Sequence, residues 1–250
     1  MPLIEEFQVQ GNYLFRYRSF FPILILVAGL GIHIHFRYME NGLGLEEYYY
    51  AICFAVSMVG QLIRVLVVGY APQKTSGRNT RKQVAEEVNT KGMYSIVRHP
   101  LYLGNFLMWF GIGMLTESIW FILIFALIYW VYYERIMFAE EAFLRGKFGD
   151  QYLVWAGSVP AFVPRLKGWI WPENYFSIKN VLRREYTSFF NLIIVFFIFH
   201  YSQSVIRYNG FTKFGTTEII WFGILAAAIL FYLTVRFLHK KTQLLNVEGR

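Results

Sequence analysis

Six long apolar runs recur along this chain, and they restrict its fold more than any other feature of the sequence. The runs cover residues 20–36, 48–70, 101–115, 118–133, 189–206 and 218–238. Each approaches the ~20 apolar residues that a helix needs to cross about 30 Å of hydrocarbon. Inside a bilayer the backbone must bond to itself, which a helix does within one segment. The sequence therefore predicts an all-α, polytopic membrane protein with about six transmembrane helices.

The composition supports a membrane protein rather than a soluble one. Of the 250 residues, 56% are hydrophobic and 16% are charged, whereas a soluble domain carries about 25% charged residues. A net charge of +8 could indicate a nucleic-acid partner, but the cations are spread between the apolar runs. We interpret them as topology signals and contacts with anionic lipid. We therefore predict membrane and lipid partners, no nucleic acid and no obligatory protein partner.

The positions of lysine and arginine predict the orientation, since six spans place both termini on one side. Of the 24 such residues, Arg37, Arg207 and Lys213 fall in loops on the other side, and Arg64 and Arg236 fall within the runs. All the others share the side of the termini. Because cytoplasmic loops collect positive charge, we expect a multi-pass protein with both termini in the cytoplasm. In a bacterium this would be the inner (plasma) membrane.

The third and fourth runs are joined by residues 116–118 alone, which predicts a tight helical hairpin. Such a hairpin returns the segment after the fourth run to the face that holds the segment before the third. The Arg-His-Pro segment 98–100 should therefore lie near the pair Glu140 and Glu141, on the cytoplasmic face. We expect these glutamates on a helix that continues the fourth run and ends at Gly149.

The start of the third run has the features of a binding site. Pro100 suits the first turn of a helix, where its missing N–H costs nothing. Free backbone N–H groups at a helix start favour an anionic group, and Arg98 and His99 would reinforce that preference. Gly104, one turn further on, allows another backbone or a flat ligand to approach closely.

Two motifs occur in order around the predicted hairpin. The first reads Gly-x-Tyr-x-x-x-Arg-His-Pro-x-Tyr-x-Gly over residues 92–104. The second reads Glu-Glu-x-x-Leu-x-x-x-Phe-Gly-x-x-Tyr over 140–152, and Val-Pro follows at 159–160. Over about residues 80–165 the chain resembles the isoprenylcysteine carboxyl methyltransferase and phospholipid methyltransferase superfamily of membrane enzymes. The resemblance is to the bacterial type, which includes members that methylate lipid A phosphates.

The resemblance implies a cytosol-facing pocket for S-adenosylmethionine between the two motifs. The implied cofactor-binding residues are Gly92, Tyr94, Arg98, His99, Pro100, Leu101, Tyr102, Gly104, Glu140 and Glu141. These residue types suit that cofactor, because carboxylates bind its ammonium or ribose, cations bind its carboxylate, and aromatic rings bind adenine. No metal site is predicted, since His33 and His35, at i and i+2, would not share a helix face.

The resemblance implies an enzyme, and we hypothesise S-adenosylmethionine-dependent methyl transfer to a membrane-embedded lipid. An anionic headgroup oxygen, such as a phosphate of lipid A or a phospholipid, is the favoured acceptor. The candidate catalytic residues are Arg64, Arg98, Arg135 and Arg183, and Arg64 with Arg135 or Arg183 would hold the acceptor. Two positions depart from the eukaryotic prenylcysteine enzymes: Ser158 and Glu87 stand where those enzymes carry arginine. A substrate carboxylate would lose partners there.

Three alternative functions remain open on the sequence. The first is prenylcysteine carboxyl methylation by the same fold. The second is an NADPH-dependent sterol-type reductase, because those enzymes share an Arg-His-Pro-x-Tyr-x-Gly-like signature, although residues 148–164 favour methyl transfer. The third is a non-enzymatic membrane scaffold. We divide the chain into a two-helix membrane region (1–70), a methyltransferase core (71–165), and a cytosolic connector with a C-terminal two-helix region (166–250).

Overall fold

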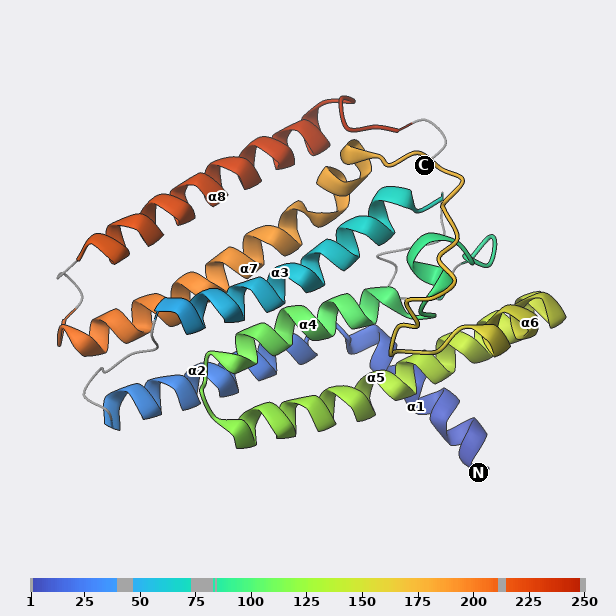
Figure 1. Cartoon of the computed structure of the whole chain (residues 1–250), viewed down its shortest axis with the longest axis horizontal. Helices are drawn as coiled ribbons and strands as arrows, with labels where there is room; N and C mark the ends of the chain where they lie inside the picture. Colours follow the sequence, from blue (N-terminus) through green and yellow to red (C-terminus); the bar gives the residue numbers. More distant parts are fainter. Residues whose placement is uncertain (1, 40–46, 73–82, 84, 211–214, 248–250) are drawn as a thin grey trace.

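The computed structural model describes residues 2–39, 47–72, 83, 85–210 and 215–247, and these residues form helices and connecting segments without strands (Figure 1). Lys213 lies outside the described residues, as does most of the loop after residue 72. The elements in order are α1 (Leu3–Tyr17), α2 (Phe21–Met39), α3 (Glu47–Tyr70), the 3₁₀ turn η1 (Gly92–Ser95), α4 (Pro100–Met114), α5 (Ile119–Phe148), α6 (Asp150–Ser158), α7 (Ile178–Arg207) and α8 (Thr216–Lys241). The predicted all-α class is confirmed.

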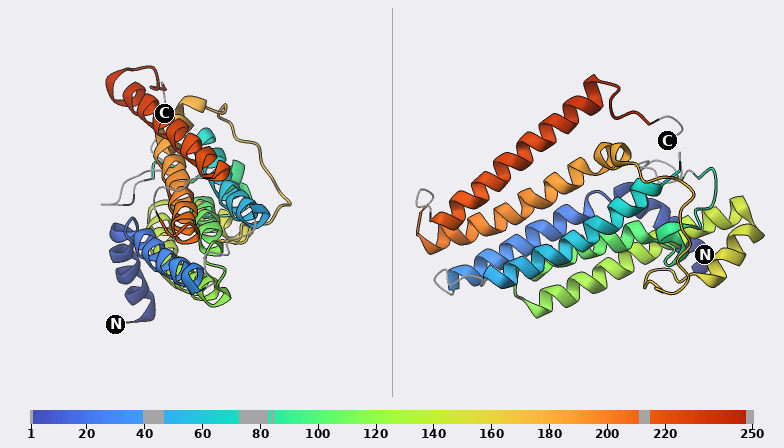
Figure 2. Two further views of the ribbon diagram at one scale, coloured as in Figure 1. Left: turned by 90° about the vertical axis from the view of Figure 1, so that its left-hand side faces the viewer. Right: turned by 45° about the horizontal axis from the view of Figure 1, so that its top comes forward.

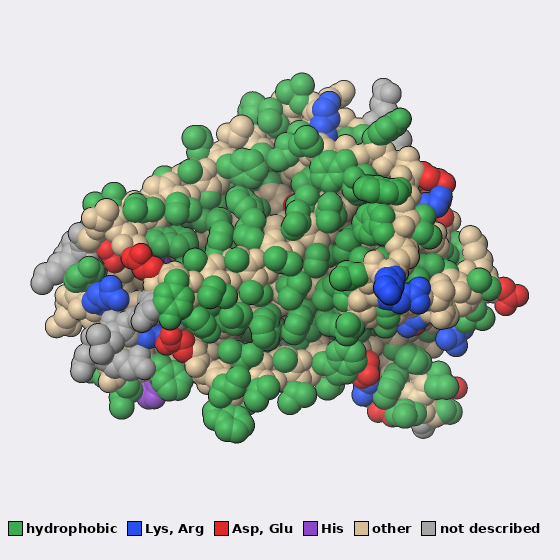
Figure 3. Space-filling model, in the orientation of Figure 1, with side chains coloured by type: hydrophobic (Ala, Val, Ile, Leu, Met, Phe, Trp, Pro, Cys, Tyr) green, Lys and Arg blue, Asp and Glu red, His purple; other side chains and the backbone are tan. Residues whose placement is uncertain are grey.

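Six helices, α2, α3, α4, α5, α7 and α8, run back and forth along the long axis of the molecule (Figures 1 and 2). The short helix α6 and the turn η1 lie at one end, together with α1 and the segment that follows α8; we call this the motif end. In Figure 3 hydrophobic side chains cover the middle of the visible face, and charged side chains gather at both ends. A protein whose middle faces hydrocarbon has this distribution.

Five helices of the described chain, α2, α3, α5, α7 and α8, are long and apolar enough to cross a membrane. The sixth predicted span corresponds to α4, which has 15 residues and so measures about 22 Å at 1.5 Å per residue. It is too short to cross about 30 Å of hydrocarbon by itself. Helix α4 packs against α3 and α5. Both of these helices are long enough to cross the hydrocarbon beside it.

The contact between α3 and α4 is the most extensive one between helices, and small residues permit it. A Cβ atom added to Gly104 would lie 2.9 Å from the backbone oxygen of Gly60, and one added to Gly111 would lie 2.2 Å from Ser57 Oγ. Small residues allow such close approach between helices in membranes. Gly104, predicted to admit a backbone or a flat ligand, therefore faces the backbone of α3.

The helix ends follow local signals, but three helices differ from the prediction, among them α6, which the sequence reasoning did not expect. Gly149 ends α5 with a φ of 53°, as predicted. The structure adds α1, which the sequence reasoning left without an element; the Tyr132 hydroxyl of α5 donates to the Leu14 oxygen of α1 at 3.1 Å. It also begins α7 at Ile178, well before the predicted start at residue 189, because the Ser177 side chain caps it by accepting from Asn180 N at 3.2 Å.

Candidate functional site

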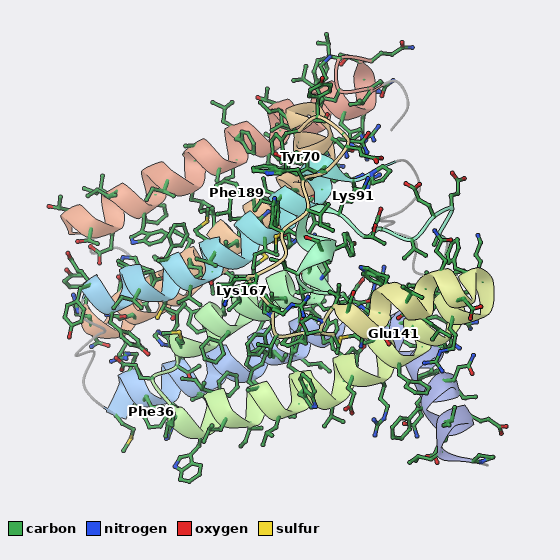
Figure 4. All side chains as sticks on the ribbon, turned by 45° about the vertical axis from the view of Figure 1, so that its right-hand side comes forward. Phe36, Tyr70, Lys91, Glu141, Lys167 and Phe189 are labelled. Carbon is green, nitrogen blue, oxygen red and sulfur yellow. The ribbon has the colours of Figure 1, made fainter. Side chains whose placement is uncertain are left out.

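The hairpin of α4 and α5 brings the two motifs into direct contact at the motif end. His99 is the N-cap of α4, and Pro100 is in the first turn. His99 Nε2 lies 2.9 Å from Glu141 Oε1, and Arg98 Nε lies 3.0 Å from the same oxygen. The predicted proximity of the Arg-His-Pro segment to the glutamate pair is thus confirmed. Figure 4 shows Glu141 on α5 at the same end as Tyr70 and Lys91, with Phe36 at the far end.

Glu140 makes a second set of contacts within the same cluster. The Tyr102 hydroxyl donates to Glu140 Oε1 at 2.7 Å, and His99 Nδ1 lies 3.7 Å from Glu140 Oε2. The rings of His99 and Tyr102 stack with centroids 5.8 Å apart. Because Nδ1 of His99 faces Glu140 and Nε2 faces Glu141, the imidazole is held between the two glutamates.

A third segment, after α6, fixes the backbone of Arg98 and His99. Arg98 N donates to the Pro160 oxygen at 2.9 Å, and His99 N donates to the Ala161 oxygen at 3.1 Å. The Arg98 guanidinium also donates to the Ala156 oxygen at 2.6 Å. The Val-Pro segment at 159–160 therefore has a structural role that sequence reasoning did not assign. The carbonyls of Pro160 and Ala161 occupy the amides of the two residues before Pro100, so these amides are not free for an anion.

Two tyrosines beside the cluster, the partly buried Tyr94 and the buried Tyr152, remain neutral. Burial raises the pKa of the Tyr94 hydroxyl, and the Glu140 carboxylate raises it further. Burial likewise raises the pKa of Tyr152, and the Glu141 carboxylate adds to the effect. Both phenols are therefore uncharged near neutral pH, and as O–H groups they are able to donate hydrogen bonds.

A cavity of about 860 Å³ extends from this cluster into the bundle. Its size falls within the ~300–1,000 Å³ typical of small-molecule sites. Polar and aromatic side chains line its motif end, among them Tyr94, Arg98, His99, Glu140, Tyr152 and Trp155. Apolar side chains of α4 and α7 line the deeper part: Met108, Trp109, Ile112, Leu192 and Val195. One cavity therefore joins a polar chamber to an apolar one.

Most of the predicted cofactor residues line this cavity: Tyr94, Arg98, His99, Pro100, Leu101, Tyr102 and Glu140. Gly92, at a φ of 60°, lines a neighbouring cavity of about 230 Å³ that shares Tyr94 with the first. Glu141 lies behind Arg98 and His99, and Gly104 packs against α3. Their roles toward a cofactor remain predictions.

The four arginines predicted to be catalytic lie in different places. Arg64 and Arg98 line the cavity. Outside its lining, Arg135 pairs with Glu134 at 2.9 Å, and Arg183 donates to Asn180 at 3.1 Å.

Two further arginines, Arg18 and Arg184, line the cavity instead. Sequence reasoning did not select either arginine as a site residue. Arg18 directly follows α1 and ends the basic aromatic stretch at 15–18, and Arg184 directly follows Arg183.

Residues 50–151 match the family model described as phospholipid methyltransferase. The protein-S-isoprenylcysteine O-methyltransferase of Schizosaccharomyces pombe is 33% identical over 107 residues, which are 42% of this chain and 45% of that one. The protein-S-isoprenylcysteine O-methyltransferase B of Arabidopsis thaliana is 34% identical over 133 residues, which are 48% of this chain and 63% of the Arabidopsis protein. Over this part of its length the chain is similar to these membrane methyltransferases.

Another relative is named as a cobalt-zinc-cadmium resistance protein, CzcN, of Cupriavidus metallidurans. It is 39% identical over 77 residues, which are 31% of this chain and 35% of that one. The chain spans about half the length of the curated relatives it matches. No solved structure matches it.

Proposed function

We propose that this protein transfers a methyl group from S-adenosylmethionine to the carboxylate of an isoprenoid-modified cysteine held in the membrane. The observation that carries the proposal is the single cavity that joins the Arg98–Glu141 cluster to an apolar chamber between α4 and α7. A water-soluble donor and a membrane-dissolved acceptor need two such chambers with a common boundary, because the reacting atoms must come within about 3–3.5 Å of each other.

The side chains of the polar chamber fit S-adenosylmethionine. That cofactor carries an ammonium, a carboxylate, a sulfonium and a flat adenine. Glu140 offers a carboxylate to the ammonium or the ribose, and Arg98 offers a guanidinium to the carboxylate. Tyr94 and Trp155 offer aromatic faces to the adenine. Both aromatic rings and both charged groups line the same cavity.

The chain's own residues have a positioning role in this reaction. When bound, the cofactor supplies a methyl group on a sulfonium, so an O–CH₃ bond forms while the S–CH₃ electron pair passes to sulfur, giving a methyl ester and S-adenosylhomocysteine. A carboxylate oxygen is already nucleophilic, so no general base is required. Glu141 holds Arg98 and His99 in place, and the apolar side chains exclude water from the chamber.

The relatives favour the prenylcysteine carboxylate over the lipid phosphate that the sequence alone favoured. Two of them are named protein-S-isoprenylcysteine O-methyltransferases. A headgroup phosphate remains a second candidate because three arginines, Arg18, Arg64 and Arg184, line the cavity, and arginine suits phosphate as well as carboxylate. With the motif end in the cytoplasm, as the positive charges indicate, the polar chamber would open toward soluble S-adenosylmethionine.

The test uses purified full-length protein in lipid nanodiscs with methyl-labelled S-adenosylmethionine. Farnesyl-cysteine, extracted phospholipid and lipid A are offered in separate reactions. We expect label in farnesyl-cysteine as an ester that alkali releases as methanol. Label in a lipid phosphate alone would replace the proposed acceptor with the second candidate.

Calorimetry with S-adenosylhomocysteine and with NADPH tests the donor. We expect binding of the former, and binding of NADPH alone would establish the reductase alternative instead. A non-enzymatic scaffold predicts that Glu140→Ala and His99→Ala leave both binding and methyl transfer unchanged, whereas we expect both variants to lose them.

A further inference from the structure

A charged network lies inside the bundle at the boundary between the polar and apolar chambers. Arg64 of α3 lies six residues before the end of that helix at Tyr70, which is about 9 Å along its axis. Its Nε lies 2.9 Å from Glu185 Oε2, and its Nη2 lies 2.8 Å from Glu185 Oε1. Arg64, which was predicted to hold the acceptor, thus pairs with a carboxylate of α7.

The network connects three helices. Arg64 Nη1 donates to Asn105 Oδ1 of α4 at 2.6 Å. Glu185 is 4% exposed and also accepts from Gln61 Nε2 at 3.1 Å, and Ser188 donates to Gln61 Oε1 at 3.2 Å. A buried ion pair is tolerated where further hydrogen bonds satisfy its members. The orientation of the guanidinium is therefore set by groups on both sides of it.

Two N–H groups of Arg64 have no partner among the residues that the structure describes. A guanidinium has five N–H groups, and the bonds to Glu185 and Asn105 use three of them. One N–H remains on each terminal nitrogen, and Arg64, Asn105 and Glu185 all line the cavity. A terminal N–H of this guanidinium is able to donate to an oxygen of a carboxylate or of a phosphate.

The surface that α7 presents to the cavity changes character along its length. Thr187, Ser188 and Asn191 line it near the network, and Leu192 and Val195 line it further from the motif end. An amphiphile with an anionic head and an apolar chain fits this order, with its head at Arg64 and its chain toward Val195. Helix α7 lies outside residues 50–151, which match the family model.

We propose that Glu185 is a positioning residue that orients Arg64 toward the anionic head of the methyl acceptor, so that α7 completes the acceptor site. This inference rests on the proposed function. It assigns the recognition of the acceptor to a helix that follows the matched core, and it separates acceptor binding from the cofactor cluster at Arg98 and Glu141.

The test compares Glu185→Gln with the charge swap Arg64→Glu/Glu185→Arg. For each variant, kcat and KM for farnesyl-cysteine, affinity for S-adenosylhomocysteine, and thermal unfolding are measured in one nanodisc composition.

We expect Glu185→Gln to raise the acceptor KM about tenfold, which corresponds to the loss of one charge-assisted hydrogen bond. The affinity for S-adenosylhomocysteine should be unchanged. The swap should restore thermal stability but not KM, because the guanidinium then projects from α7. Glu117→Gln, in an Arg–Glu pair outside this cavity, is the control.

Two outcomes would overturn the inference: an unchanged acceptor KM in Glu185→Gln, or a swap that restores KM together with stability. Direct binding of a fluorescent farnesyl-cysteine without cofactor separates this inference from the proposed function. Wild-type protein that binds the probe without methylating it would refute the proposed function, and the probe's affinity for Glu185→Gln would still decide the inference. Wild-type protein that binds neither farnesyl-cysteine nor an anionic lipid would overturn both.

Discussion

Each end of the bundle has an arginine paired with a glutamate and a buried histidine nearby, but the two groups have different surroundings. At the motif end, Arg98 and His99 contact Glu141 and border the large cavity. At the opposite end, Arg37 is 2% exposed and pairs with Glu117. His33 there lies with Nδ1 2.8 Å from the Leu115 oxygen. Neither Arg37 nor His33 lines either of the cavities described above.

The comparison shows that residue types alone do not distinguish a binding site from a structural contact. At the far end, Arg37 and His33 connect α2 to the turn between α4 and α5. Arg37 pairs with Glu117 in that turn, and His33 contacts the Leu115 carbonyl that follows α4. The motif-end group connects segments that also form a cavity wall. We therefore expect substitutions at the two ends to affect different measurements.

The largest effect is expected at Glu141. Glu141→Ala removes the partner that holds Arg98 and His99, and hydrogen bonds to charged groups contribute about 1.5–3 kcal/mol. Affinity for S-adenosylhomocysteine should fall ~10–150-fold, measured by calorimetry. The matched change Glu117→Ala should leave that affinity unchanged. Equal affinities in the two variants would remove the functional distinction between the ends.

A smaller effect of the opposite kind is expected at Arg37. Arg37→Met leaves Glu117 without its partner, and since that carboxylate is 39% exposed, water compensates part of the loss. The free energy of unfolding should fall by about 1–3 kcal/mol, seen as a lower midpoint of thermal unfolding in detergent. Cofactor affinity should stay at the wild-type value. A loss of affinity in this variant would indicate that the two ends are coupled.

The smallest effects separate two positions on one helix. A Cβ at Gly104 would lie 2.8 Å from Arg64 Cγ, and a Cβ at Gly111 would lie 2.4 Å from the Cys53 oxygen. Alanine at either position should cost about 1 kcal/mol through overpacking. Only Gly104→Ala should raise the acceptor KM, because only it displaces Arg64. Gly146→Ala, with open space around it, is the control and should not destabilise the protein. A raised KM in Gly111→Ala would contradict this assignment.

Features set by short-range pattern could be predicted from the sequence. The three-residue link at 116–118 predicted the hairpin, and the hairpin predicted the contact between the Arg-His-Pro segment and the glutamates. Gly149 predicted the end of α5. Helix α1 was missed because Glu5, Glu6 and Arg16 interrupt its apolar positions, so it has no long apolar run.

Features that depend on distant partners could not be predicted. Glu185 reaches Arg64 from 121 residues away, and the Pro160 carbonyl reaches Arg98 across three helices. No local pattern records either pairing. The same reason explains why Arg135 and Arg183 could not be told apart from Arg18 and Arg184. The three-part division of the chain remains a prediction, since α3 and α7 both pack against α4.

The length of α5 has a consequence for how the protein responds to its membrane. One uninterrupted helix of 30 residues carries both an apolar stretch and the glutamate pair near its end. It measures about 45 Å, so part of it must extend beyond about 30 Å of hydrocarbon. When bilayer thickness changes, such a helix tilts to keep its apolar stretch covered. The glutamates would then shift relative to Arg98, so methyl transfer should depend on the acyl-chain length of the surrounding lipid.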